Sequence, residues 1–155
     1  MTNPFNHPAM VDISLLLGRL TLGLNLLLAG WTKVTGGFEK FVSKGFMPLR
    51  PEWLPEAIAR PYGYAIPVLE LVTGLLLVLG LFTRWAGGIM ALMLLSIFIA
   101  VVTDKGITGG QAGAFHYSII LASMAFIIAI VGPGRLALDP LYFGGGNAGG
   151  GGRAK

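Results

Sequence analysis

The stretch that decides the fold is LLLGRLTLGLNLLLAGWTK, residues 15–33. It is almost entirely apolar, and it is long enough to cross the hydrocarbon core of a bilayer as a helix, which takes about 20 residues. Arg19 nevertheless lies within it. A charged side chain inside a bilayer costs about 2.5–3.5 kcal/mol on insertion scales, so it must face the interior of a helix bundle and find a partner there. The stretch therefore predicts a membrane bundle with a buried polar contact.

The composition of the whole chain is typical of a membrane protein. Hydrophobic residues make up 54% of its 155 residues and charged residues only 12%, about half the charged share of a soluble domain. The net charge of +4 comes from Lys and Arg in short loops between apolar segments, which favours the headgroups of a lipid bilayer over nucleic acid as the counter-charge. The sequence has no cysteine, which excludes disulfides, thiolate metal sites and cysteine nucleophiles.

The apolar segments predict an all-α fold, an integral membrane four-helix bundle with an interfacial segment between its first and second helices. In lipid every backbone polar group must be hydrogen-bonded within its own segment, so the spans are expected to be helices. A single membrane domain is expected over residues 1–143, followed by a flexible glycine-rich tail at 144–155. The four spans are expected at residues 13–33, 62–82, 85–103 and 114–131.

Aromatic and charged residues at the ends of the spans predict contacts with lipid headgroups. The connection between the first two spans interleaves aromatic and basic side chains, which is typical of a segment lying in the interface, with an ordinary polar loop as the alternative. Asp139 is expected to lie close enough to pair with Arg135, or with Arg84 in the short hairpin between the second and third spans. The candidate interfacial anchors are Trp31, Trp53, Arg84, Trp85, Arg135 and Asp139.

Arg19 and Glu70 are predicted to form an intramembrane charge pair, since Glu70 is the only acidic residue within a predicted span. Each charge shares a helix face with small residues, which let helices approach closely in lipid. Two interpretations stay open: a structural latch between the first two spans, or the polar wall of a cavity for a quinone headgroup or a proton path. In a third, Arg19 reaches the interface unpaired. The two faces are Arg19, Gly23, Gly30, Lys33 and Gly63, Pro67, Glu70, Gly74.

Other polar side chains within or at the ends of the spans are candidates for lining such a cavity. A haem held by two histidines is disfavoured, because the second histidine of the chain, His7, lies in the N-terminal tail. No metal-binding or nucleotide-binding motif is found. We therefore assign no catalytic residue and no metal site, and we expect no covalently bound or metal-ligated cofactor, which leaves quinone open. The candidate cavity residues are Asn25, Lys33, Thr73, His116 and Ser123.

Three motifs taken together resemble the DoxX family of small four-span bacterial membrane proteins. They are GRLTLGLNLLLAGWTKVTGGF at residues 18–38, PVLELVTGLLLVLGLFTRWAG at 67–87 and GPGRLALD at 132–139. The resemblance implies a multi-pass protein of the bacterial cytoplasmic (inner) membrane with both termini in the cytoplasm. The numbers of Lys and Arg in the loops do not fix that orientation by themselves.

The resemblance also implies a link to quinone-dependent electron transfer, because the family is named after a relation to a subunit of thiosulfate:quinone oxidoreductases. We therefore expect an accessory or structural subunit of a quinone-linked membrane redox complex, with other membrane or membrane-associated redox subunits as partners. A stand-alone membrane scaffold or a transporter of small solutes or lipids is the alternative. An enzyme of the thiosulfate:quinone oxidoreductase type ranks below both. Without cysteine or a haem-binding pair the chain is not expected to be catalytic alone.

Overall fold

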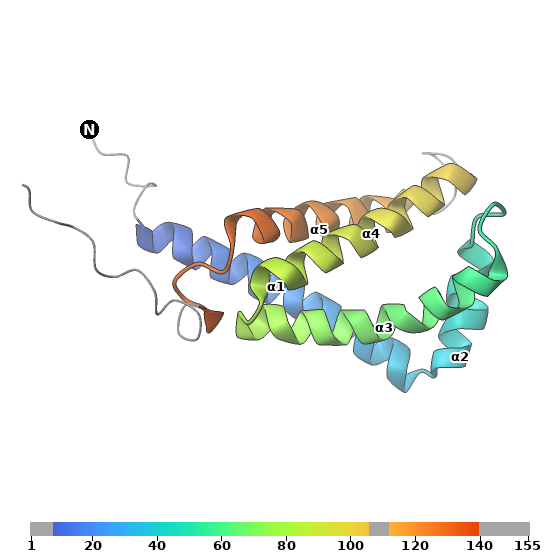
Figure 1. The fold of residues 1–155 in the computed structure, drawn as a ribbon, viewed down its shortest axis with the longest axis horizontal. Coiled ribbons are helices and arrows are strands. Elements are labelled where there is room, and N and C mark those ends of the chain that lie inside the picture. The colour runs from blue at the N-terminus through green and yellow to red at the C-terminus, as the bar shows by residue number, and fades with distance from the viewer. Residues whose placement is uncertain (1–7, 106–111, 140–155) are drawn as a thin grey trace, which may run out of the picture.

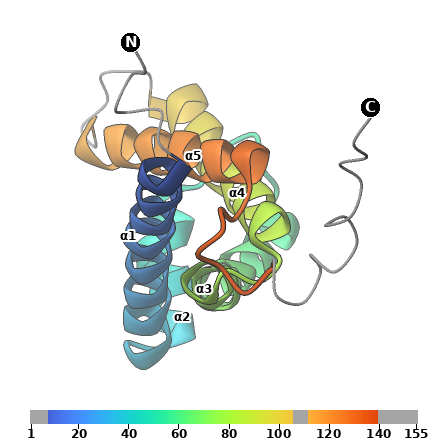
Figure 2. The same ribbon diagram turned by 90° about the vertical axis from the view of Figure 1, so that its left-hand side faces the viewer.

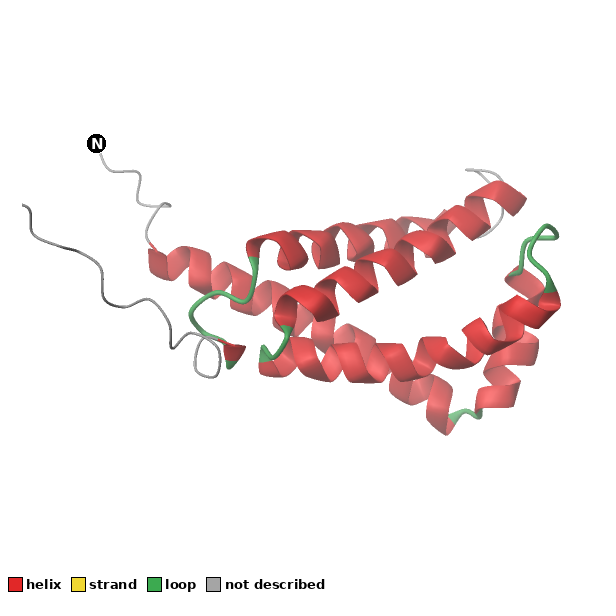
Figure 3. Cartoon of the chain, in the orientation of Figure 1, coloured by secondary structure: helices red, strands yellow, loops and turns green. Residues whose placement is uncertain are grey.

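The computed structural model describes residues 8–105 and 112–139, and helices make up most of this part of the chain (Figures 1 and 3). No strand occurs among the described residues. The predicted all-α class is confirmed. The four long helices are α1 (Pro8–Thr35), α3 (Glu56–Leu79), α4 (Thr83–Lys105) and α5 (Ala112–Val131).

Length and composition allow these helices to cross a membrane. The described residues contain three helical segments that are long and apolar enough, Ala9–Thr35, Glu56–Leu79 and Thr83–Thr103, and a shorter apolar one at Tyr117–Val131. Their outer faces carry large apolar side chains, of which Leu28 and Leu92 are among the most exposed. Helices that are apolar on all sides are typical of a membrane span. The structure is therefore a membrane helical bundle, as the sequence predicts.

The helices extend beyond the predicted spans at their N-terminal ends. The first helix begins at Pro8 rather than residue 13, and the second long helix begins at Glu56 rather than residue 62. Pro55 precedes it in an extended conformation, since a proline ring suits the position just before or at the first turn of a helix. The predicted tail at 144–155 lies outside the described residues.

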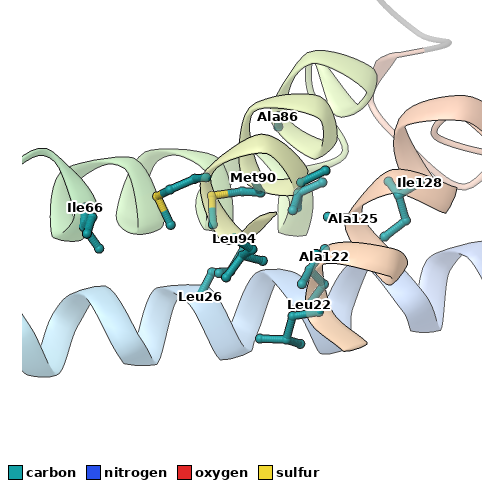
Figure 4. Packing of buried hydrophobic residues seen from close by; sticks show 13 residues of the cluster. Leu22, Leu26, Ile66, Ala86, Met90, Leu94, Ala122, Ala125 and Ile128 are labelled. Atoms are coloured by element: carbon teal, nitrogen blue, oxygen red, sulfur yellow. The ribbon is translucent and has the colours of Figure 1, made fainter. Parts of the chain in front are cut away.

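The long helices form two antiparallel pairs, with α1 along α3 and α4 along α5 (Figures 1 and 2). The pairs meet around a buried apolar core in which Leu22 and Leu26 of α1 face Met90 and Leu94 of α4 and Ala125 of α5 (Figure 4). The two pairs pack against each other through this core. The polar sites described below lie outside this core.

Glycines let α1 and α3 approach closely. A Cβ atom built on Gly23 would lie 2.9 Å from the carbonyl oxygen of Gly74, and one built on Gly74 would lie 2.9 Å from that of Gly23. A Cβ built on Gly30 would lie 2.9 Å from the carbonyl oxygen of Pro67. Such distances are too short for a real side chain, so the contact requires small residues, as in other membrane helix pairs. Gly23 and Gly30 of one predicted face and Pro67 and Gly74 of the other lie in this contact, whereas a Cβ on Gly63 would meet the ring of Phe46 instead of α1.

The connection between α1 and α3 is helical and packs against α3. It contains α2 (Phe38–Lys40), the π-helix η2 (Phe41–Phe46) and the 3-10 helix η3 (Met47–Leu49). The rings of Phe46 and Tyr62 meet edge to face, with centroids 5.9 Å apart. The indole N–H of Trp53 donates a hydrogen bond of 3.2 Å to Thr103 at the end of α4. The connection is thus an ordered part of the bundle, and its place in a lipid interface stays a prediction.

Candidate functional site

The predicted Arg19–Glu70 pair does not form. Both side chains are buried, with exposed fractions of 1% and 6%, but each has another partner. The reason is the register of α1 against α3, which places Gly30 against Glu70 and Arg19 against Gly80. Glu70 and Gly80 are separated by about 15 Å along a helix that rises about 1.5 Å per residue. The two charges therefore lie in different places.

Glu70 pairs with Lys33 instead. The ammonium nitrogen of Lys33 lies 2.5 Å from each carboxylate oxygen of Glu70, and it lies 5.3 Å from the centroid of the Phe41 ring. The carboxylate is almost fully buried, whereas Lys33 is partly exposed. Removing one partner of such a pair leaves an uncompensated charge in the bundle. A charge pair between the first two spans thus exists, but with Lys33 in place of Arg19, and its role as a structural latch stays a prediction.

Lys33 also borders a pocket of about 390 Å³ at the end of α1. We call it the lysine pocket. All of its charged lining residues are lysines, and three glycines form part of its wall. Lys33 was predicted to line a cavity, and the structure places it in this one. The lining residues are Thr32, Lys33, Gly36, Gly37, Lys40, Phe41, Lys44 and Gly45.

Arg19 lies at the other end of the α1–α3 contact, beneath the turn between α3 and α4. Its Nη2 donates a hydrogen bond of 2.5 Å to the carbonyl oxygen of Leu136, in the segment after α5. Gly80 has a φ of 70°, and a Cβ there would overlap Nη1 of Arg19. Among the described residues, Nε and Nη1 of Arg19 have no hydrogen-bond partner. The guanidinium is therefore held by the backbone of a segment distant in sequence.

Asp139 joins the segment after α5 to the start of α4. Its carboxylate accepts hydrogen bonds from the backbone N–H groups of Phe82 and Thr83, at 2.6 and 2.9 Å, and its own N–H donates to the carbonyl of Gly80 at 2.8 Å. The first N–H groups of a helix lack intrahelical partners and attract a carboxylate. Asp139 was expected to pair with Arg135 or Arg84. Among the described residues it forms neither ion pair, and its carboxylate caps α4 instead.

A second pocket, of about 350 Å³, opens beside this junction, and we call it the hairpin pocket. Thr83 is fully buried there, and its hydroxyl has no hydrogen-bond partner among the described residues. Trp85 is 75% exposed, so the pocket lies at the outer surface of the bundle. Aromatic rings, a guanidinium and an unused hydroxyl together can orient a flat molecule that carries carbonyl oxygens. The lining residues are Phe82, Thr83, Arg84, Trp85, Pro133 and Asp139.

Two other predicted cavity residues, Thr73 and Ser123, form hydrogen bonds within their own helices. The hydroxyls of Thr73 and Ser123 each donate to a carbonyl four residues earlier in their own helix, at 2.5 and 2.8 Å. Ser123 borders an apolar groove between α4 and α5 rather than a polar cavity. Asn25 is half-buried on α1, and the side chain of His116 lies outside the described part of the structure. Within that part, no group of three or more His, Asp and Glu side chains could hold a metal ion.

The predicted anchors lie at or near the ends of helices. The side chains of Trp31 and Trp53 are exposed, as is that of Trp85. Arg84 and Arg135 are exposed as well. Their positions are compatible with contacts to lipid headgroups, which stay a prediction.

We call the contacts of Arg19, the α3–α4 turn and the segment after α5 the Arg19 junction. The sequence analysis missed two of its residues. The first is Asp12, whose carboxylate accepts a hydrogen bond of 2.9 Å from the backbone N–H of Arg135. The second is Gly80, which the sequence shows only as one residue of the motif at 67–87. A signal existed for Asp12, because it is the only acidic residue before the first predicted span.

Comparisons with known proteins agree with this architecture. The DoxX family model matches residues 14–103, which contain Arg19, Lys33, Glu70 and the α3–α4 turn. The Bacillus subtilis (strain 168) protein named "Putative oxidoreductase CatD" is 32% identical over 137 residues, which cover 86% of this chain and 90% of that protein. No solved structure matches the chain. The chain belongs to the DoxX family of membrane proteins.

Proposed function

We propose that this chain is a membrane-embedded accessory subunit of a quinone-linked redox complex, and that its hairpin pocket holds the quinone headgroup. The observation that carries the proposal is the hydroxyl of Thr83, which is buried in the wall of this pocket next to Arg84 and has no partner among the described residues. The relative's name, "Putative oxidoreductase CatD", supports a role in redox chemistry.

The lining of the hairpin pocket fits such a headgroup. A quinone is a flat ring with two carbonyl oxygens, which accept hydrogen bonds. The Thr83 hydroxyl and the Arg84 guanidinium are donors, and the rings of Phe82 and Trp85 offer apolar faces for the flat ring. Sites for small molecules are mostly apolar, hold a few polar groups and measure about 300–1,000 Å³. The volume of about 350 Å³ suits a headgroup without its tail.

The position of the pocket also suits a molecule that lies partly in lipid. The pocket is at the start of α4, and exposed tryptophans such as Trp85 favour the boundary between headgroups and hydrocarbon. Ile89 and Leu92 continue the exposed face of α4 from Trp85 into the span. An isoprenoid tail could therefore lie along α4 while the ring occupies the pocket.

Hydrogen bonds in and next to the pocket wall fix the shape of the pocket. Asp139 bonds the N–H groups of Phe82 and Thr83, and Arg19 bonds the carbonyl of Leu136 three residues earlier. A bound quinone would supply two-electron, two-proton redox chemistry. We assign the electron donor to a partner subunit, because the chain has no cysteine and only two histidines with which to hold a redox centre.

The test is purification of the chain from its native membrane in mild detergent, followed by quantification of extracted quinone and mass spectrometry of the proteins that remain bound. Wild type is expected to retain quinone and a cofactor-bearing protein. Thr83→Val replaces the hydroxyl with a methyl group of similar shape, and Arg84→Met removes the guanidinium. Each is expected to lower quinone retention about 2- to 10-fold, since one hydrogen bond contributes about 0.5–1.5 kcal/mol.

Thr73→Val is the matched control, because Thr73 is also buried but its hydroxyl bonds the carbonyl of Leu69 in its own helix. Its quinone retention should equal that of wild type. Equal retention in Thr83→Val, Arg84→Met and Thr73→Val would contradict the assignment of the pocket. A wild-type chain that carries neither quinone nor a cofactor-bearing protein would contradict the function itself.

A further inference from the structure

We infer that the lysine pocket binds a phosphate group, supplied by an anionic phospholipid or by free phosphate. The pocket lies next to Lys33, on a different part of α1 from Arg19, and shares no lining residue with the hairpin pocket. The inference is therefore independent of the proposed quinone site.

The charge of the pocket favours an anion. Lys33, Lys40 and Lys44 line it, and no carboxylate does. Lys40 and Lys44 are exposed and are separated by one helical turn, a spacing at which like charges repel each other. The nearest acidic residue in sequence, Glu39, accepts a hydrogen bond from the hydroxyl of Tyr64 on α3. An anion bound between Lys40 and Lys44 would remove their repulsion.

Lys33 adds a fixed donor at the inner side of the pocket. An ammonium group has three N–H donors, and two of them suffice for the two oxygens of Glu70. Because Glu70 neutralises Lys33, the net positive charge of the pocket comes from Lys40 and Lys44. Two positive charges and one further donor suit a phosphate group, which carries one or two negative charges and accepts several hydrogen bonds.

Three glycines form part of the pocket wall. Gly37 has a φ of 96°, a conformation that favours glycine, and a Cβ on Gly36 would lie 2.8 Å from the carbonyl oxygen of Thr32. The N–H groups of Gly36 and Gly37 bond carbonyls at the end of α1, at 2.9 and 3.1 Å. These bonds cover carbonyls that would otherwise repel an anion. The glycines thus allow the tight turn at the end of α1, and the lysines supply the donors.

The location of the pocket agrees with a headgroup site. It lies where α1 ends and where the connection folds back against α3 (Figure 1), next to the exposed Trp31. Basic pockets between membrane helices are known to bind the phosphates of anionic lipids. The same donors would serve inorganic phosphate from water, so the experiment has one arm for each source.

The first arm uses native mass spectrometry of the full chain released from nanodiscs of equimolar phosphatidylglycerol and phosphatidylcholine. Wild type is expected to retain phosphatidylglycerol about fivefold or more over phosphatidylcholine, and Lys40→Gln and Lys44→Gln should each lower that ratio about fivefold, the effect of one lysine near a lipid surface. Arg60→Gln is the matched control, since it removes one exposed positive charge outside the pocket. Lys33 is left in place because its loss would unpair Glu70.

The second arm titrates inorganic phosphate into the detergent-solubilised chain by calorimetry. Saturable binding that Lys40→Gln and Lys44→Gln abolish, without a lipid preference in the first arm, supports the site and assigns it to free phosphate. A lipid preference without phosphate binding supports the site and assigns it to the lipid. If both lysine variants match Arg60→Gln in both arms, the inference is overturned.

Discussion

Arg19 and Lys33 lie on the same face of α1, and the bundle accommodates their charges in different ways. Lys33 meets the carboxylate of Glu70 on the neighbouring helix. Arg19 meets the backbone carbonyl of Leu136, while Gly80 leaves space for its guanidinium. The difference shows that a buried cation in a membrane bundle need not have a side-chain anion in contact with it. A carbonyl at the end of another segment can serve as well.

The two arrangements also connect different parts of the molecule. The Lys33–Glu70 pair joins α1 and α3, which already pack closely. Its contribution to stability is lost when either of the two charges is removed. The Arg19 junction joins α1 to the α3–α4 turn and to the segment after α5, and Asp139 ties those two together. We therefore expect the free energy of unfolding to fall when a charge of the Lys33–Glu70 pair is removed. At the Arg19 junction we expect it to fall when a larger side chain fills the space next to the guanidinium.

The largest effect is expected from Lys33→Met. The carboxylate of Glu70 stays buried without its cation, which should lower the free energy of unfolding by about 3–5 kcal/mol. Unfolding of the purified chain in detergent, by heat and by sodium dodecyl sulfate, measures this loss. Lys44→Met, which removes an exposed lysine of the same pocket, should change stability little. Equal effects of the two substitutions would contradict the role of the Lys33–Glu70 pair.

Gly80→Ala tests the Arg19 junction through space rather than charge. The new methyl group would overlap the guanidinium and lie 2.8 Å from Cβ of Ala137, and the backbone is left-handed at this residue. Strain and overpacking together should cost about 2–4 kcal/mol. The control is Gly88→Ala in α4, where an added Cβ meets nothing within 4 Å. Similar unfolding temperatures for both variants would exclude a tight junction at Gly80.

Asp139→Ala removes the cap of α4. The N–H groups of Phe82 and Thr83 lose their acceptor, and loss of such a cap typically costs about 1–2 kcal/mol. Thermal unfolding in detergent measures the change, and hydrogen exchange at the start of α4 should rise in parallel. Arg135→Ala serves as the control, because Arg135 is exposed and takes part in the junction through its backbone N–H. An Asp139→Ala variant as stable as Arg135→Ala would disprove the cap.

The smallest effect is expected from Arg60→Gln. Arg60 and Glu56 form an ion pair of 3.1 Å one helical turn apart, but their side chains are 48% and 59% exposed. Water screens such pairs, so stability should change by no more than about 0.5 kcal/mol. A loss of stability as large as that of Lys33→Met would contradict the view that burial makes the Lys33–Glu70 pair stronger than the exposed Arg60–Glu56 pair.

Much of the fold could be predicted from the sequence. Apolar segments of membrane-spanning length predicted the long helices, and the two residues between the second and third predicted spans, 83 and 84, leave room only for a tight turn between them. The glycine faces predicted the α1–α3 contact, because the periodicity of a helix assigns residues to a face. Periodicity does not fix how far one helix is shifted along another, and the Arg19–Glu70 prediction was wrong for that reason.

A better criterion for the register was present in the sequence. Pairing the small residues with each other, Gly23 with Gly74 and Gly30 with Pro67, gives one register for antiparallel helices, and it is the register observed. That register places Arg19 near the end of α3 and leaves Glu70 within reach of Lys33. The hairpin pocket could not be predicted in this way, because its walls come from segments whose proximity depends on where α5 ends.

Double-mutant cycles test the central claim, that Lys33 rather than Arg19 is the partner of Glu70, most directly. The variants are Lys33→Met, Arg19→Met and Glu70→Gln, alone and in the two combinations with Glu70→Gln, and the measured quantity is the free energy of unfolding in detergent. The structure predicts a coupling of about 1–3 kcal/mol between Lys33 and Glu70, and additivity within about 0.5 kcal/mol for Arg19 and Glu70. Coupling between Arg19 and Glu70, with additivity for Lys33 and Glu70, would contradict the account.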